Sequence, residues 1–249
     1  MRIISSSKIS SIRVKPPDFL LRTALFLALV TSLNGCAPAY ERYMQEGHKL
    51  HGAHENSKAK ERFHSAVIEA RHDTKGKERL IDAILAEKEC AVALKQTDDA
   101  QRLLNEAATI MEKNSELKRA AMLHKEAGEL CAADDTTTAL DCFSSGLADL
   151  KEAGLQTTPE KASLLAAVAG SKSAQGDLKS AQSYLEKACA ILDKIKYNEN
   201  DRVHANYLHN LAAIYDKENR DNDAIDANEK AKKYELSGID YAIGRQPKF

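Results

Sequence analysis

Residues that break helices or build large aromatic cores are scarce in this 249-residue sequence. Tryptophan is absent, aromatic residues make up 5% of the chain, and there are five prolines. Three prolines lie at or before position 38 and one lies at position 247, so Pro159 alone interrupts the long middle part. Because proline ends or kinks a helix, this distribution predicts an all-α chain.

A basic excess is also missing. The formal net charge is -1 at pH 7, and the first 35 residues hold five basic residues against one acidic residue. Without that segment, 31 basic and 36 acidic residues remain. Proteins bind phosphate backbones through a basic surface, so this balance argues against a nucleic-acid partner.

Sequence patterns of known catalytic sites are absent as well. The chain has no glycine-rich phosphate loop, no nucleophile elbow and no paired-carboxylate arrangement. Glu87 and Glu126 stand at equivalent places in two segments, but an isolated acid on a helix is usually solvated or paired with a base. We therefore expect a protein that is not an enzyme and that binds no cofactor.

What the sequence does contain is one order of side-chain sizes, repeated five times. A small, a large and a small residue follow at i, i+4 and i+7, which places them on one helical face. The intervals between the first members are 41, 39, 42 and 43 residues. The five sets are Ala59-Phe63-Ala66, Ala100-Leu104-Ala107, Ala139-Phe143-Gly146, Ala181-Leu185-Ala188 and Ala224-Asn228-Ala231. A period of this length is typical of repeat arrays.

A second helix is predicted before each set. Twelve residues upstream of the first members lie Gly47, Lys88, Ala127, Ala169 and Ala212, of which four are small. Small residues allow close helix packing, so each unit is predicted to be a helical hairpin.

These residues resemble the tetratricopeptide repeat, with small residues at unit positions 8, 20 and 27. The resemblance covers residues 40–236, and the segment Asn206–Ala231 is similar to the longer repeats of kinesin light chains. Lys88 at a normally small site and Asn228 at a normally large site depart from the pattern, and no unit has the family's tryptophan or late proline. The resemblance implies a right-handed α-solenoid of five hairpins, whereas a helical bundle with chance alanine stripes is the alternative. The expected units are 40–73, 81–114, 120–153, 162–195 and 205–236.

Capping residues support this division. Thr158-Pro159-Glu160 has the hydroxyl, proline and acid typical of a helix start. Ser237-Gly238 is expected to end the last helix and to leave 237–249 as a tail. Four polar pairs are expected just before the second helices of units two to five: Asp98-Asp99, Asp135-Thr136, Gly176-Asp177 and Asn222-Asp223.

The N-terminus indicates export. Thr23–Leu33 is an uncharged apolar run of 11 residues, too short for a bilayer span but suited to a signal peptide. The following Leu33-Asn34-Gly35-Cys36 resembles the lipobox of bacterial lipoproteins, which implies removal of 1–35, a lipid on Cys36 and a short tether, 36–39. A plain secretory signal or an anchor helix interrupted by Arg22 is the alternative. The resemblance places the chain on the bacterial cell envelope, in the outer membrane where there is one.

Histidines and cysteines give two further candidates. His48 and His51 are helix neighbours and could share a metal ion, but no acidic partner is evident, so we expect solvated histidines and no metal. Cys90, Cys131, Cys142 and Cys189 lack metal-ligand spacing. Buried free thiols are expected, and a Cys131–Cys142 disulfide is conceivable.

The tetratricopeptide resemblance implies a binding groove lined by the first helices. The lysine–asparagine pair that clamps a terminal carboxylate in some relatives is missing, whereas Asn210 resembles asparagines that hold a peptide backbone. The groove residues expected are His48, Leu85, Glu89, His124, Asn206, His209 and Asn210. The sequence thus favours an envelope lipoprotein that binds a protein or peptide as a scaffold or assembly factor. Alternatives are a ligand or metal sensor using the histidine-rich first unit and an accessory subunit of an envelope enzyme.

Overall fold

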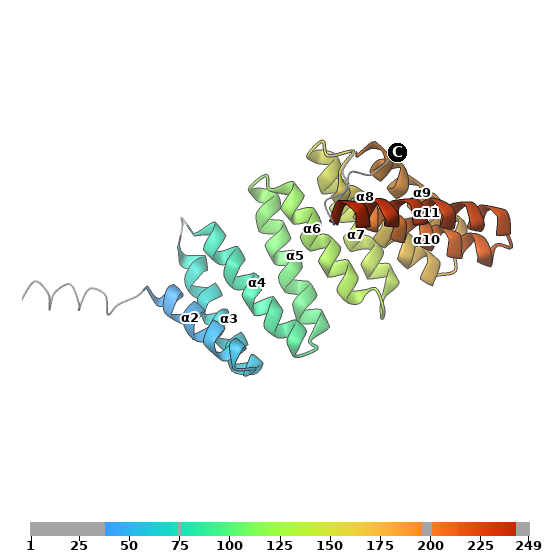
Figure 1. The fold of residues 1–249 in the computed structure, drawn as a ribbon. Coiled ribbons are helices and arrows are strands. Elements are labelled where there is room, and N and C mark those ends of the chain that lie inside the picture. The colour runs from blue at the N-terminus through green and yellow to red at the C-terminus, as the bar shows by residue number, and fades with distance from the viewer. Residues whose placement is uncertain (1–37, 74–75, 196–200, 243–249) are drawn as a thin grey trace, which may run out of the picture.

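The computed structural model describes residues 38–73, 76–195 and 201–242, and all of its regular structure there is helical (Figure 1). The helices of the first three hairpins are α2 (Ala39–Gly52), α3 (Asn56–His72), α4 (Lys77–Ala93), α5 (Thr97–Lys113), α6 (Leu117–Cys131) and α7 (Thr136–Glu152). Those of the last two are α8 (Pro159–Ala174), α9 (Leu178–Lys194), α10 (Asp201–Lys217) and α11 (Asp221–Ala242).

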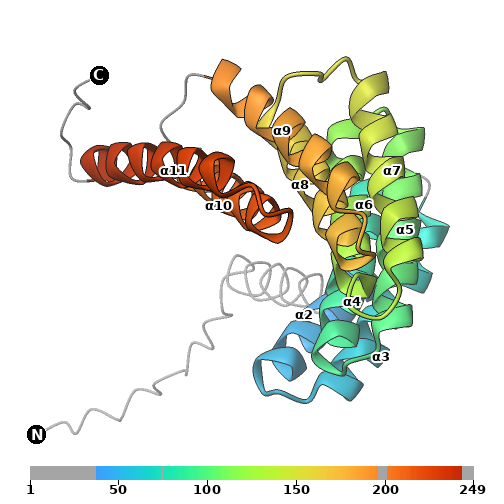
Figure 2. The same ribbon diagram turned by 90° about the vertical axis from the view of Figure 1, so that its right-hand side faces the viewer.

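Each of these helices packs on the next one along the chain. Pairs such as α2–α3 and α10–α11 form hairpins, and the second helix of each hairpin contacts the first helix of the following hairpin. Figure 2 shows the resulting curved stack, with α4, α6 and α8 toward its inner side and α5 and α7 toward its outer side. The predicted right-handed solenoid of five hairpins is confirmed across the described residues. None of the helices described combines the length and the apolar composition needed to cross a bilayer.

The repeated small–large–small order is what brings the helices together. Its alanines are buried in every hairpin. In the first hairpin the Phe63 ring lies so close to Gly47 that a Cβ there would be 2.6 Å from a ring carbon. In the third hairpin Phe143 approaches Gly128 in the same way, at 2.4 Å. The absence of a side chain on one helix therefore makes the space that an aromatic ring on its partner fills.

Three helix starts carry the caps that their sequences predict. The Thr158 hydroxyl accepts a hydrogen bond from the Lys161 backbone N–H (3.3 Å), and Pro159 occupies the first turn of α8. Asp135 caps α7 by accepting from the N–H groups of Thr137 and Thr138. Asp177 caps α9 by accepting from the N–H of Ser180 at 3.1 Å. These acceptors satisfy backbone donors that a helix leaves unpaired at its N-terminus.

The other two expected caps lie inside their helices and not before them. Asp98-Asp99 and Asn222-Asp223 fall inside the first turns of α5 and α11, so the prediction that they precede these helices is wrong. The chain turns before them through residues with a left-handed backbone instead. One residue with positive φ stands in each of six interhelical turns: His54, Lys95, Ser115, Gly154, Gly176 and Asn219. The residue after it donates back to a carbonyl five positions earlier, as Gln96 does to Ala91 (2.9 Å). This is the Schellman ending of a helix.

The last helix is longer than its sequence indicates. The helix α11 continues through Ser237-Gly238 to Ala242, so the prediction that these two residues end it is wrong. Glycine inside a helix costs only about 1 kcal/mol, and no proline follows until residue 247 to block the next turns. Residues 1–37, with the expected signal peptide and Cys36, and the end of the expected tail at 243–249, lie outside the described residues.

His204 is the most deeply buried histidine of the described chain, at 2% exposure. Its ring stacks on Tyr234 of α11 at 4.1 Å between centroids. Burial lowers the pKa of His204, Lys230 lowers it further, and Asp193 and Asp201 oppose the change. The folded chain therefore favours the neutral ring at the α10–α11 contact.

Two glycines offer a test of the packing argument. A Cβ at Gly146 would lie 2.8 Å from the Ala121 carbonyl oxygen and 3.2 Å from Leu164, whereas a Cβ at Gly170 would meet nothing within 4 Å. We expect Gly146→Ala to destabilise the fold by about 1 to 3 kcal/mol through overpacking. Gly170→Ala is the matched control and should stabilise it by about 0.5 to 1 kcal/mol. Urea unfolding measures both, and equal effects of the same sign would contradict the assignment.

His204 predicts a pH dependence of stability. A histidine whose folded pKa is depressed takes up its proton more readily in the unfolded chain, so it stabilises the fold at neutral pH and this contribution fades as pH falls through the unfolded pKa, about 6.5. We expect the melting temperature of the wild type to fall more steeply between pH 7.5 and 5 than that of His204→Phe. His72→Gln, at an exposed position, should keep the wild-type slope. A His204→Phe variant with an unchanged slope would refute the assignment.

Candidate binding surface

A pocket opens on the inner side of the array between α8 and α10. Its volume is about 300 Å³. It is lined by Ala166, Ala169, Gly170, Ser173, Leu185, Asn210, Ala213, Ile214 and Lys217. Of the lining residues, Asn210 is among the seven expected groove residues. Small side chains on the facing helices create the hollow because they leave the space between α8 and α10 unfilled.

The pocket has three polar side chains, each with a different functional group. Asn210 is exposed and offers an amide that can both donate and accept. Lys217 supplies a positive charge one helical turn beyond the wall residue Ala213. Ser173 adds a hydroxyl from α8. The pocket can therefore take a neutral or acidic chain segment that needs hydrogen bonds along one edge.

The groove residues expected in the first two hairpins lie on α2 and α4, away from this pocket. His48 is exposed and meets the Phe63 ring edge-on, at 5.0 Å between centroids. Leu85 is half-buried against the core. Glu89 is exposed and accepts a 2.5 Å hydrogen bond from Lys88. These three residues lie on the first helices of their hairpins, but they do not line the pocket that contains Asn210.

Lys88 is a long charged side chain at a repeat position that is otherwise small, and its ammonium group is ion-paired there. Its side chain is only 6% exposed, at a site where the other hairpins have a small residue. The ammonium group donates to Glu89 at 2.5 Å and to Glu126 of the next hairpin at 2.7 Å. These two partners raise the pKa of Lys88 against the opposing effect of burial, which is the largest single influence. The charge is thus buried as part of an ion pair that links two repeats.

In the last hairpin, Asn206 is exposed on α10, whereas His209 faces its own partner helix. Its Nδ1 lies 2.8 Å from the Asn228 amide oxygen, and its Nε2 lies 3.0 Å from a Glu235 carboxylate oxygen. These two hydrogen bonds raise the pKa of His209. The polar Asn228, at a normally large site, is explained by this contact, and His209 joins α10 to α11 instead of lining the pocket.

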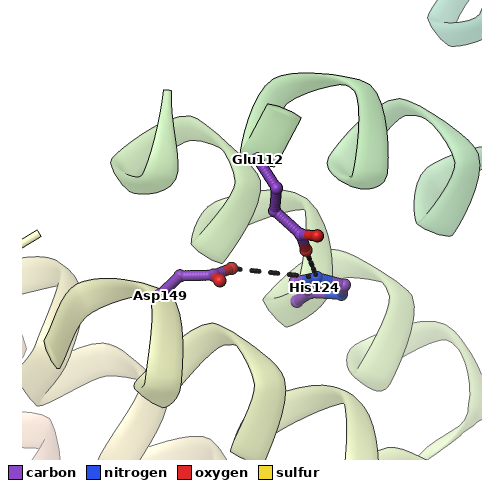
Figure 3. Close-up of side chains that lie close together, drawn as sticks. All are labelled: Glu112, His124 and Asp149. Atoms are coloured by element: carbon purple, nitrogen blue, oxygen red, sulfur yellow. Dashed lines mark hydrogen bonds and ion pairs between the residues drawn. The ribbon is translucent and has the colours of Figure 1, made fainter. Parts of the chain in front are cut away.

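His124 lies in the interior, not on an open groove wall. This α6 residue is 8% exposed, and its side chain contacts residues of α5 and α7. Its Nε2 is 2.8 Å from Glu112 and 3.7 Å from Asp149 (Figure 3). The expectation that His124 faces a partner in the groove is not met, because the side chain at this position of the third hairpin turns toward the preceding repeat.

The histidine-rich first hairpin does not gather its rings into a metal site. His51 Nδ1 lies 2.9 Å from the Asn56 amide oxygen and 3.6 Å from the Cys90 sulfur. His54 has a left-handed backbone in the α2–α3 turn. Neither of these histidines nor His48 belongs to the one group of three potential metal ligands found among the described residues.

The four cysteines of the described chain are buried free thiols, as the sequence predicts. Cys131 and Cys142 lie near each other, since the Gln101 amide nitrogen is 3.7 Å from each sulfur. Burial raises the pKa of Cys189 to about 12. The thiols therefore pack as small apolar groups, and Cys189 is held in its unreactive protonated form.

A second cavity, of about 340 Å³, lies between α9 and α11 and was not predicted. Acidic residues Glu186, Asp193, Asp223 and Asp226 surround it, with Lys230 as the base. Asp193 already receives hydrogen bonds from Tyr234 (2.8 Å) and Lys230 (3.2 Å). The carboxylate is thus engaged in joining the two helices.

Comparison with known proteins places this fold. No protein-family model matches the sequence, and no curated protein matches it. The structure is similar to BtubC (BKLC) from P. vanneervenii, with a TM-score of 0.64 and 16% identity over 84% of this chain and 83% of that one. It is also similar to a Podosopora anserina protein with nearly identical TPR-like repeats of the kinesin light chain type, with a TM-score of 0.59 and 16% identity over 80% of this chain and 97% of that one.

A third similar structure is a Rap protein complexed with competence and sporulation factor. The TM-score is 0.55 at 18% identity, and the match covers 87% of this chain and 60% of that one. All three similarities are at 18% identity or less and concern the fold, which in this chain is an array of helical hairpins stacked in chain order. The chain has the TPR-like α-solenoid fold.

Proposed function

We propose that this protein is a non-enzymatic scaffold that binds a segment of another protein on the inner side of its repeats. The observation that carries the proposal is the pocket between α8 and α10. Its walls hold small side chains at Ala166, Gly170 and Ala213, so a bound chain can come close to the helices. Asn210 lines the same pocket, and its side-chain amide can donate a hydrogen bond through its NH₂ group and accept one through its oxygen.

An extended peptide suits this chemistry. Each of its residues presents one N–H and one carbonyl group, and a single side-chain amide can pair with both groups of one residue. Lys217 at the same pocket favours a segment with an acidic group nearby. The similarity to a Rap protein complexed with competence and sporulation factor supports the use of such an array for recognition, and the pocket is the location that we propose for it in this chain.

We also propose that the scaffold is tethered to the bacterial cell envelope through a lipid on Cys36. The apolar run Thr23–Leu33 followed by Leu33-Asn34-Gly35-Cys36 supports it. Only Ala37 and Pro38 separate the cysteine from α2, which begins at Ala39. Such a tether spans about 10 Å when extended. The repeats would then bind their partner close to the membrane surface.

The pocket predicts position-dependent crosslinking. A photoreactive amino acid at Ala213, which lines the pocket, should crosslink to a defined segment of one partner protein in cells. The matched control is the same group at Ser144, which is exposed on α7. Asn210→Ala should lower the yield at Ala213 about fivefold, as expected for the loss of about 1 kcal/mol of hydrogen bonding. Mass spectrometry of the product identifies the segment.

Two outcomes would contradict the pocket proposal. Equal products from Ala213 and Ser144 would show that the contact is nonspecific. Products that contain only lipid or sugar would show that the inner face does not bind a protein.

The lipid anchor predicts a change in membrane association. The wild-type chain should sediment with membranes, and its N-terminal peptide should carry the mass of acyl chains on Cys36. Cys36→Ala should release the protein or leave it unprocessed, because stable anchoring requires the acyl chains. Cys90→Ala, at a buried thiol, should remain lipidated. A wild-type peptide without added mass would disprove the anchor while leaving the pocket proposal open to its own test.

A further inference from the structure

Three potential metal ligands converge at the junction of the second and third hairpins. They are Glu112 in the last turn of α5, His124 in α6 and Asp149 in the last turn of α7. Figure 3 shows the two carboxylates reaching toward the imidazole from separate helices. One ligand atom from each of the three side chains lies within 4.8 Å of the others. The ligand atoms of the site are thus preassembled by the packing of two repeats.

The distances suit a small divalent ion. Nitrogen and oxygen ligands bind Zn²⁺ at about 2.0 to 2.2 Å, which puts neighbouring ligands about 3 to 3.5 Å apart. His124 Nε2 lies 2.8 Å from Glu112 Oε1 and 3.7 Å from Asp149 Oδ2. Shifts of less than 1 Å would place all three around one ion.

Hydrogen bonding within the group leaves one ligand unsatisfied. A single N–H on Nε2 can serve Glu112 at 2.8 Å, but 3.7 Å is too long for a hydrogen bond to Asp149. Asp149 is 8% exposed, and its Oδ2 is buried without a hydrogen-bond partner. Within the described chain, neither Glu112 nor Asp149 is ion-paired with a lysine or arginine. A buried carboxylate oxygen without a partner is uncommon in folded proteins and points to a missing partner such as a bound ion.

The helix ends add to the demand for positive charge. Glu112 is one residue from the end of α5, and Asp149 is three residues from the end of α7. The C-terminus of a helix carries partial negative charge and favours cations. Two carboxylates whose oxygens lie within 4.8 Å of each other, one of them on the buried Asp149, repel each other unless a cation lies between them. Glu112 keeps a side-chain exposure of 36%, which gives the ion a path from solvent.

We propose that Glu112, His124 and Asp149 form a binding site for one divalent transition-metal ion, of which Zn²⁺ is the representative. The imidazole favours Zn²⁺ over Mg²⁺ or Ca²⁺, which prefer all-oxygen sites. Water would complete the coordination on the side open at Glu112. Because the ligands come from two repeats, the ion links α5 to the α6–α7 hairpin and stiffens this junction of the array.

Metal binding to the full-length chain tests the site. The chain is stripped with a chelator, dialysed and titrated with Zn²⁺ by calorimetry, with Mg²⁺ as a second probe. We expect one Zn²⁺ per chain, much weaker Mg²⁺ binding, and a higher melting temperature with Zn²⁺. Asp149→Asn and Glu112→Gln should each weaken Zn²⁺ binding at least tenfold and abolish the rise in melting temperature.

Two controls distinguish this site from metal binding elsewhere on the chain. Asp141→Asn removes an exposed carboxylate from the same helix, α7, and should bind Zn²⁺ as the wild type does. The double variant His48→Gln/His51→Gln removes the histidines of the first hairpin and should also bind normally. The partly exposed Glu112 position makes Glu112→Gln informative even if Asp149→Asn folds poorly, which circular dichroism would reveal.

The proposal is overturned by any of three results. One is the absence of Zn²⁺ binding to the wild type. Another is equal affinity in the wild type, Asp149→Asn and Glu112→Gln, which would leave the three side chains as an ion-pair cluster only. The third is loss of binding in His48→Gln/His51→Gln alone, which would assign the ion to the first hairpin. None of these results bears on the peptide pocket between α8 and α10, so the two proposals fail independently.

Discussion

The close approach of two helices over a missing side chain is the contact on which the rest of this structure depends. Phe63 fills the space over Gly47, and Phe143 fills the space over Gly128. A buried aromatic ring gains about 25 cal/mol for each Å² of apolar surface removed from water, but only if its neighbour leaves room. The other hairpins pack the same helical faces with other residues of the small–large–small order, so the array is a sum of local contacts between neighbours.

The same dependence explains which features could be predicted from sequence. The small–large–small order is local, so the sequence alone identified the packed faces and the pairing of helices. Thr158, Asp135 and Asp177 were recognisable as caps for the same reason, since a cap acts within three residues. The end of α11 could not be predicted in this way, because a Ser-Gly pair can end a helix but can also lie inside one, as Ser237-Gly238 does. Lys88 was recognised as a departure, but its solution depends on Glu126 of the next repeat, which the local pattern does not specify.

The candidate site residues also differ in whether the local repeat pattern or contacts with other helices determine their environment. Asn210 was predicted from its place in a repeat, and it does line a pocket. His124 stands at the repeat position that His209 has in the last hairpin, yet its environment is set by Glu112 and Asp149, which come from two other helices. Burial raises the pKa of Asp149 to about 6, with Glu112 adding to the effect and His124 opposing it. A ligand set spread over three helices at irregular spacing has no sequence signature of the kind that paired cysteines or histidines provide.

Polar side chains at the junctions between hairpins specify which hairpins pack together, which the apolar residues alone do not. Buried alanines of the repeated order recur in every hairpin, so they do little to distinguish one junction from another. The buried Lys88–Glu126 pair fits only between the second and third hairpins, and the Glu112–His124–Asp149 cluster lies at the same junction. A buried charge without its partner is costly, so these contacts penalise any other register. The junction of the second and third hairpins therefore carries two such contacts, and it lies two hairpins away from the last one, whose α10 forms one wall of the pocket between α8 and α10.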